Sequence, residues 1–131
     1  MTWTQFHDMN SGGGQKLDWA QIFIEAPRKE AESVFSARFG RSPNRVTCTC
    51  CGPDYSVNEE PTLEQITWFE RGCKLSKDGA VIEEQGAEYR PYLTLREYIA
   101  RKDVKVIPAN EISEQERAAI VKRQGYIWVD E

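Results

Sequence analysis

Several classes of protein are excluded by what this sequence lacks. No apolar run approaches the roughly 20 residues of a membrane-spanning helix. The N-terminus, MTWTQFHDMN, does not have the basic-then-apolar layout of a signal peptide. Basic residues are not in excess, because 17 Lys and Arg stand against 21 Asp and Glu, a net charge of −4. Direct nucleic-acid binding normally needs a strongly basic face. We therefore expect a cytoplasmic protein with neither a membrane nor a nucleic-acid partner.

The residues that are present predict one globular domain over 1–131. Hydrophobic residues make up 40% of the chain, enough for a core, and no repeat or linker divides it. Residues 19–25, WAQIFIE, predict a strand, and a helix is expected from Pro27 to Gly40, where proline suits the first position and glycine the end.

Short helices and strands are predicted along the rest of the chain. Three pairs have the spacing of a capping box, in which a hydroxyl and a later side chain satisfy free backbone amides: Thr62 with Gln65, Thr94 with Glu97, and Ser113 with Glu116. Further strands are predicted at Val46–Cys50, Ala80–Glu84, Val104–Ile107 and Tyr126–Val129. The expected fold is α+β, a mixed or antiparallel sheet of about five short strands packed on one side by about four short helices.

The stretch VTCTCCG, residues 46–52, holds three of the four cysteines and allows three interpretations. Cys48, Cys51 and the following glycine have the layout of a zinc knuckle, but zinc needs about four ligands and the chain offers only Cys73 with His7 or Asp54 to complete them. The alternation of Cys48 and Cys50 with threonines instead favours a strand with buried structural thiols, by a narrow margin. A reactive thiol is the third interpretation, and it lacks both a recognisable base and a helix start.

A glycine run and a basic turn form a candidate anion site. SGGGQK lacks the spacing of the nucleotide-binding P-loop, but three glycines can form a backbone cradle for an anion. The turn RFGRSPNR supplies arginines that would complete the site if the two segments meet. The alternative is a mobile loop and solvated arginines. The candidate residues are Ser11, Gly12, Gly13, Gly14, Lys16, Arg38, Arg41 and Arg45.

The negative charge of the chain is concentrated in residues 46–70. This segment holds five acidic residues and no Lys or Arg, whereas the flanking segments come to +1 and zero. A solvated loop and helix face is one interpretation. The other is a surface that binds a basic partner, and its candidate residues are Asp54, Glu59, Glu60 and Glu64.

Several segments together resemble a family of small bacteriophage proteins: FHDMNSGGGQK, IFIEAPRKEAESVFSARFGRSPNRVTCTCCGPDYSV, RGC and TLREYIARKDVKVIPANEIS. The resemblance implies a phage origin and the cytoplasm of a bacterial host, and it brings no activity with it. In that pattern a histidine commonly follows DM, whereas Asn10 stands there in this chain and the histidine is His7.

These observations favour a binding protein over an enzyme, since no catalytic residues are identified. The expected function is that of a small acidic phage accessory protein that binds and modulates a host macromolecule, such as a component of host defence. The alternative is a binder of, or enzyme acting on, a nucleotide or another phosphate-bearing ligand through the SGGG loop and nearby arginines. Zinc is the candidate cofactor.

Overall fold

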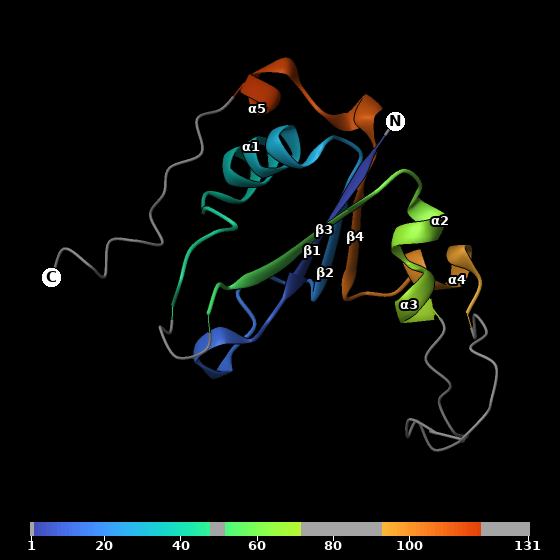
Figure 1. Cartoon of the computed structure of the whole chain (residues 1–131), viewed down its shortest axis with the longest axis horizontal. Helices are drawn as coiled ribbons and strands as arrows, with labels where there is room; N and C mark the ends of the chain where they lie inside the picture. The colour runs from blue at the N-terminus through green and yellow to red at the C-terminus, as the bar shows by residue number, and fades with distance from the viewer. Residues whose placement is uncertain (1, 48–51, 72–92, 119–131) are drawn as a thin grey trace, which may run out of the picture.

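A four-stranded mixed sheet forms the centre of the protein. The structure is a computed structural model and describes residues 2–47, 52–71 and 93–118. The strands are β1 (Trp3–Asp8), β2 (Gln21–Ile24), β3 (Tyr55–Glu60) and β4 (Val104–Ile107), in the order β3-β1-β2-β4 (Figure 1). β1 is antiparallel to both β2 and β3, and β2 is parallel to β4.

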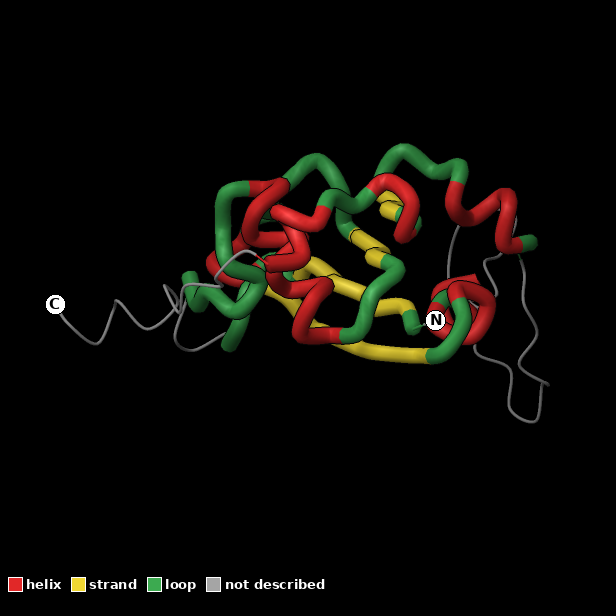
Figure 2. Tube along the Cα trace, turned by 90° about the horizontal axis from the view of Figure 1, so that it is seen from above, coloured by secondary structure: helices red, strands yellow, loops and turns green. Residues whose placement is uncertain are grey.

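Helices cover both faces of this sheet. On one face lies α1 (Arg28–Phe39), against which α5 (Glu114–Ala118) packs; on the other lie α2 (Leu63–Ile66), α3 (Trp68–Arg71) and α4 (Leu95–Ile99). Short 3-10 turns occur at Ser11–Gly13 (η1) and Ala109–Glu111 (η2). Figure 2 shows the strands running through the middle of the molecule with the helical segments around them. The prediction that helices pack on one side only is therefore wrong.

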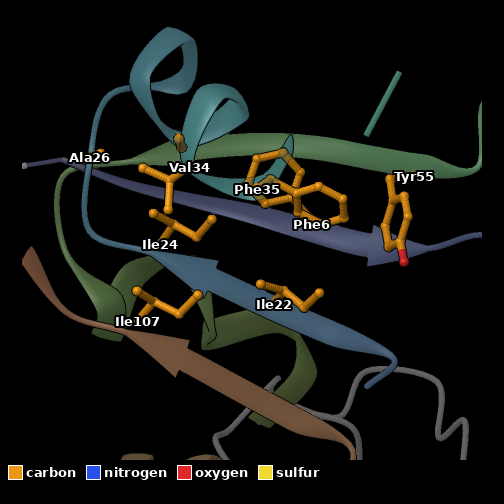
Figure 3. Close-up of a cluster of buried hydrophobic side chains, with 9 residues drawn as sticks. Phe6, Ile22, Ile24, Ala26, Val34, Phe35, Tyr55 and Ile107 are labelled. Atoms are coloured by element: carbon orange, nitrogen blue, oxygen red, sulfur yellow. The ribbon is translucent and has the colours of Figure 1, made fainter. Parts of the chain in front are cut away.

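The alternation of side chains along β1 builds a separate core on each face. Phe6 packs with Ile22, Ile24 and Phe35 beneath α1, and the rings of Phe6 and Phe35 are 4.8 Å apart (Figure 3). On the opposite face the second core contains Trp3, Phe23, Ile66, Tyr98 and Val104. Both sides of the central strands are thus removed from water, which explains why β2 is buried along its whole length.

The elements with strong local signals are confirmed. These are β2, β4 and α1, whose C-terminal Gly40 has the left-handed φ of 69°. The capping boxes of Thr94 with Glu97 and of Ser113 with Glu116 have both of their bonds. In the third pair the Thr62 hydroxyl accepts from the Gln65 N–H at 3.1 Å. The Gln65 side chain accepts from that same hydroxyl and not from the backbone N–H of Thr62, so this pair is not a complete capping box.

Other predictions fail or fall outside the described residues. The strand predicted at Val46–Cys50 does not begin there, because residues 46 and 47 belong to no strand and Asp54 holds Thr47. The remainder of that segment lies outside the described residues, as do the strands predicted at Ala80–Glu84 and Tyr126–Val129. The sequence patterns missed β1 and β3 altogether. The α+β class with a mixed sheet is confirmed.

Candidate functional site

Two loops meet where β1 ends and β3 begins, and Asp8 holds the first of them. Its two carboxylate oxygens accept from the backbone N–H groups of Asn10 and Lys16, both at 2.7 Å. Asn10 and Lys16 lie on either side of the three glycines, so this carboxylate fixes both ends of the glycine loop, residues 10–16. The Asp8 side chain is buried.

The glycine loop closes on its own lysine. Gly12 and Gly13 have φ values of 75° and 86°, which only glycine adopts readily. The Lys16 ammonium donates to the carbonyls of Ser11 and Gly14. A Cβ at Gly12 would lie 3.2 Å from Thr47 Cγ2, so the loop packs closely against the segment that precedes the cysteines. The lysine charge is thus directed at the loop's own carbonyls.

Of the three candidate arginines, only Arg41 contacts this loop. It donates to the Lys16 carbonyl at 3.3 Å, which brings together the two halves of the predicted anion site. Arg38 instead forms an ion pair with Glu116 at 2.8 Å, and Arg45 is exposed, with its carbonyl accepting from the Asp54 N–H.

Asp54 is buried and cannot be a residue of the protein surface. Its side chain is 0% exposed, and its carboxylate accepts from the N–H and the hydroxyl of Thr47, both at 2.9 Å. Arg41 lies 3.7 Å from the same carboxylate. The prediction that Asp54 binds a partner is therefore wrong: its charge is compensated inside the fold, where it joins the arginine turn to the start of β3.

Two donors in this region have no acceptor among the described residues. Tyr55 is 3% exposed, and neither its hydroxyl nor the Nε–H of Arg41 has a hydrogen-bond partner there. Burial raises the pKa of the Tyr55 phenol, with a further contribution from the charge of Asp8, so the group stays neutral and remains a donor. Figure 3 shows this hydroxyl at one end of the core beneath α1.

Of the one histidine and three cysteines predicted as metal ligands, His7 alone lies in the part of the chain that the structure describes. His7 lies on β1, where its Nδ1 contacts the side-chain amide of Gln21. Cys48, Cys51 and Cys73 lie outside the described residues. Within the described ranges no group of three or more His, Cys, Asp or Glu side chains could hold a metal ion.

The histidine belongs to a row of polar side chains that sequence patterns did not indicate. Gln5 Nε2 donates at 2.8 Å to both Gln21 Oε1 and Glu70 Oε1, and Gln21 contacts His7. Both glutamines are buried on the sheet face opposite α1. The row joins β1, β2 and α3 across the sheet. Its members are separated by as many as 65 residues, so no local pattern could reveal it.

The predicted acidic residues other than Asp54 form a surface at the outer side of the sheet. We call it the acidic edge: Asn58, Glu59 and Glu60 at the end of β3, and Glu64 in α2, all of them exposed. Two of the four also have side-chain contacts within the fold. The Glu59 carboxylate accepts from the Arg28 N–H at the start of α1, at 2.8 Å, and Asn58 Nδ2 donates to Gln5 Oε1 at 3.3 Å. Among the described residues, the side chains of Glu60 and Glu64 form neither an ion pair nor a hydrogen bond, which makes them the cleaner probes of this surface.

Comparison with known proteins assigns no family. No family model, curated protein or solved structure matches this chain. No helix of the described residues is long and apolar enough to cross a membrane. The candidate sites are therefore the acidic edge and the cluster of Asp8, Arg41, Asp54 and Tyr55.

Proposed function

We propose that this chain is a non-enzymatic binding protein that docks a basic surface of a host macromolecule on its acidic edge. The observation that carries the proposal is the exposure of Glu59, Glu60 and Glu64 on an outer strand and the helix that follows it. Acidic groups gathered on one surface attract basic partners and disfavour acidic ones. The resemblance to bacteriophage proteins makes a protein of the bacterial host the expected partner.

The cluster of Asp8, Arg41, Asp54 and Tyr55 supports a small anionic ligand less well. Its one cationic group, the Arg41 guanidinium, is already paired with Asp54, and the ammonium of the adjacent Lys16 is directed at loop carbonyls. The two buried carboxylates there would repel an anion. Binding of a nucleotide is accordingly the second candidate.

Charge reversal at the acidic edge tests the proposal. We expect the double variant Glu60→Lys/Glu64→Lys to lose affinity for a host protein captured by the wild-type chain, by about tenfold or more at low salt. The captured protein would be identified by mass spectrometry, purified, and titrated against each variant at several salt concentrations. The wild-type affinity should fall as salt rises, and that of the double variant should change less.

A matched control separates the position of the charge from its amount. Asp18→Lys/Glu114→Lys makes the same change in net charge at two exposed residues that lie on neither β3 nor α2. It should retain most of the wild-type affinity. Equal affinity and equal salt dependence of the wild type and of Glu60→Lys/Glu64→Lys would contradict the proposed function.

A further inference from the structure

β3 is an outer strand, and its hydrogen-bonding pattern shows which backbone groups face outward. The Asp8 N–H donates to Ala20 and the Met9 N–H to Asp54, both at 2.9 Å. In an antiparallel ladder, bonded and non-bonded pairs alternate. The backbone groups of even-numbered β1 residues therefore bond to β2, and those of odd-numbered residues bond to β3. The odd-numbered residues His7, Gln5 and Trp3 pair with Ser56, Asn58 and Glu60, so the backbone N–H and C=O groups of these three β3 residues face β1.

The residues between them point their N–H and C=O groups away from the sheet. They are Tyr55, Val57 and Glu59. None of the three has a backbone hydrogen bond beyond the sheet within the described ranges. Before the strand, both backbone groups of Asp54 are already bonded, the C=O to the Met9 N–H at 2.9 Å and the N–H to the Arg45 carbonyl at 2.8 Å, so the open stretch begins at Tyr55. A strand edge of this kind can receive another strand.

Acidic side chains flank this open edge on both sheet faces. Glu59 projects on the face of α1, since it pairs with Thr4, and Glu60 projects on the opposite face with Trp3. Glu64 adds a third exposed carboxylate from α2. In an added strand, side chains alternate between the two faces, so basic residues at both kinds of position would meet an acidic neighbour within cross-strand reach.

We infer that the basic partner binds by strand addition: an extended segment carrying Lys or Arg pairs its backbone with Tyr55, Val57 and Glu59 and places its charges beside Glu59, Glu60 and Glu64. Backbone hydrogen bonds supply the docking and the carboxylates select for a basic segment. A second copy of this chain is disfavoured as the added strand, because its own β3 carries Glu59 and Glu60 and has no Lys or Arg to place beside these carboxylates. The inference rests on the proposed function and specifies how the partner is bound.

Two synthetic peptides separate strand addition from charge attraction alone. The first is a blocked peptide in which two lysines alternate with two valines, so that lysines lie on both faces of the added strand, and it is long enough to pair along the whole of β3. The second is identical in sequence but N-methylated at every backbone amide, so that it keeps the charges and has no N–H donors. We expect the first to bind with a salt-dependent affinity and the second to bind roughly tenfold more weakly, since each lost backbone hydrogen bond lowers affinity.

The possible results distinguish the two proposals. Equal, salt-dependent binding of both peptides would overturn strand addition and leave the acidic docking surface standing. If neither peptide bound, or if binding ignored salt and the Glu60→Lys/Glu64→Lys substitutions, the proposed function would fail as well. The wild-type chain and the Asp18→Lys/Glu114→Lys control should bind the first peptide alike.

Hydrogen exchange provides a second measurement that needs no substitution. In the free protein the amides of Val57 and Glu59 should exchange quickly, and those of Ser56 and Asn58, which bond to β1, should exchange slowly. Adding the lysine–valine peptide should slow exchange at Val57 and Glu59 specifically. Slow exchange at these two amides before any peptide is added would mean that the edge is already occupied, and the inference would be wrong.

Discussion

At the scale of single residues, two buried neighbours at the start of β3 differ in whether their polar groups are hydrogen-bonded. The Asp54 carboxylate accepts two hydrogen bonds from Thr47 and lies near Arg41. The hydroxyl of Tyr55 is as deeply buried and has no partner among the described residues. Leaving a buried polar group unsatisfied costs free energy, whereas a satisfied one contributes modestly. The two substitutions that remove these groups should therefore change stability in opposite directions.

We expect Tyr55→Phe to raise the free energy of unfolding by about 1 kcal/mol, because it removes a buried donor without an acceptor and keeps the ring. Chemical denaturation followed by tryptophan fluorescence would measure the change. The contrasting variant Asp54→Ala should lower stability by about 2–3 kcal/mol, because it leaves the Thr47 N–H without its acceptor and Arg41 without its ion-pair partner. A clear loss of stability in Tyr55→Phe would show that its hydroxyl has a partner after all.

The error about Asp54 shows what a residue-level pattern can and cannot predict. Its acidic neighbours Glu59, Glu60 and Glu64 are exposed, as expected for charged side chains. Asp54 is buried because Thr47 and Arg41 fold back on it, and those contacts depend on the path of a loop. The sequence predicts an anion site only if the arginine turn meets the glycine loop. It cannot show that Arg41 reaches the Lys16 carbonyl, because a bond from a side chain to a distant backbone group leaves no pattern in composition.

At the scale of elements, one ion pair fastens α5 to α1. Arg38 donates to both carboxylate oxygens of Glu116, at 2.8 and 3.0 Å, and also to the Glu111 carbonyl. Glu116 accepts from the Ser113 N–H in its capping box as well. The hydrogen bond from Arg38 is the main reason that the pKa of Glu116 falls to about 2, and the backbone bond from Ser113 adds to it.

This depressed pKa predicts how the docking of α5 responds to acid. The contribution of Glu116 to stability is present above its ordinary pKa of 4.5 and is lost as the pH falls toward 2. Glu116→Gln should be less stable than the wild type at neutral pH, by about 1 kcal/mol for a partly exposed pair. Its stability should also fall less steeply in acid. Urea denaturation across this pH range, with Glu114→Gln as the control on the same helix, would test both points; parallel curves for wild type and Glu116→Gln would contradict them.

At this scale, the sequence predicts the features whose residues lie close together along the chain. The capping boxes of Thr94 and Ser113 involve residues three apart, and both were found from the sequence. The pair Arg38–Glu116 joins residues 78 apart and could not be foreseen. β1 was missed because it buries polar Thr4, Gln5 and Asp8 among its apolar residues. β3 was missed because its exposure rises along the strand, so that its acidic end resembles a loop.

At the scale of the whole molecule, the distribution of charge and the order of the strands converge on the same surface. The sheet ends at β3 on one side, and the segment with the most negative local charge supplies that outer strand and the helix after it. Natural proteins place charges on open strand edges because such edges otherwise pair with other chains. On this chain the carboxylates would serve two purposes, repelling a second copy and attracting a basic segment.

This double role predicts that neutralising the acidic edge changes the association state. Glu59→Gln/Glu60→Gln/Glu64→Gln changes the net charge from −4 to −1 and keeps a side-chain acceptor for the Arg28 N–H. We expect this variant to associate at concentrations where the wild type remains monomeric, with slowed hydrogen exchange at Val57 and Glu59 in the associated form. Sedimentation velocity over a concentration series would measure the change.

The matched variant Asp18→Asn/Glu30→Gln/Glu114→Gln has the same net charge and leaves the acidic edge intact. It should stay monomeric if the position of the charges is what matters. Equal association of the two variants would mean that lowered net charge alone drives self-association. If the Glu59→Gln/Glu60→Gln/Glu64→Gln variant instead stayed monomeric, with fast hydrogen exchange at Val57 and Glu59, the carboxylates would not be needed to keep copies apart. Backbone pairing at β3 would then be too weak by itself to hold a second chain.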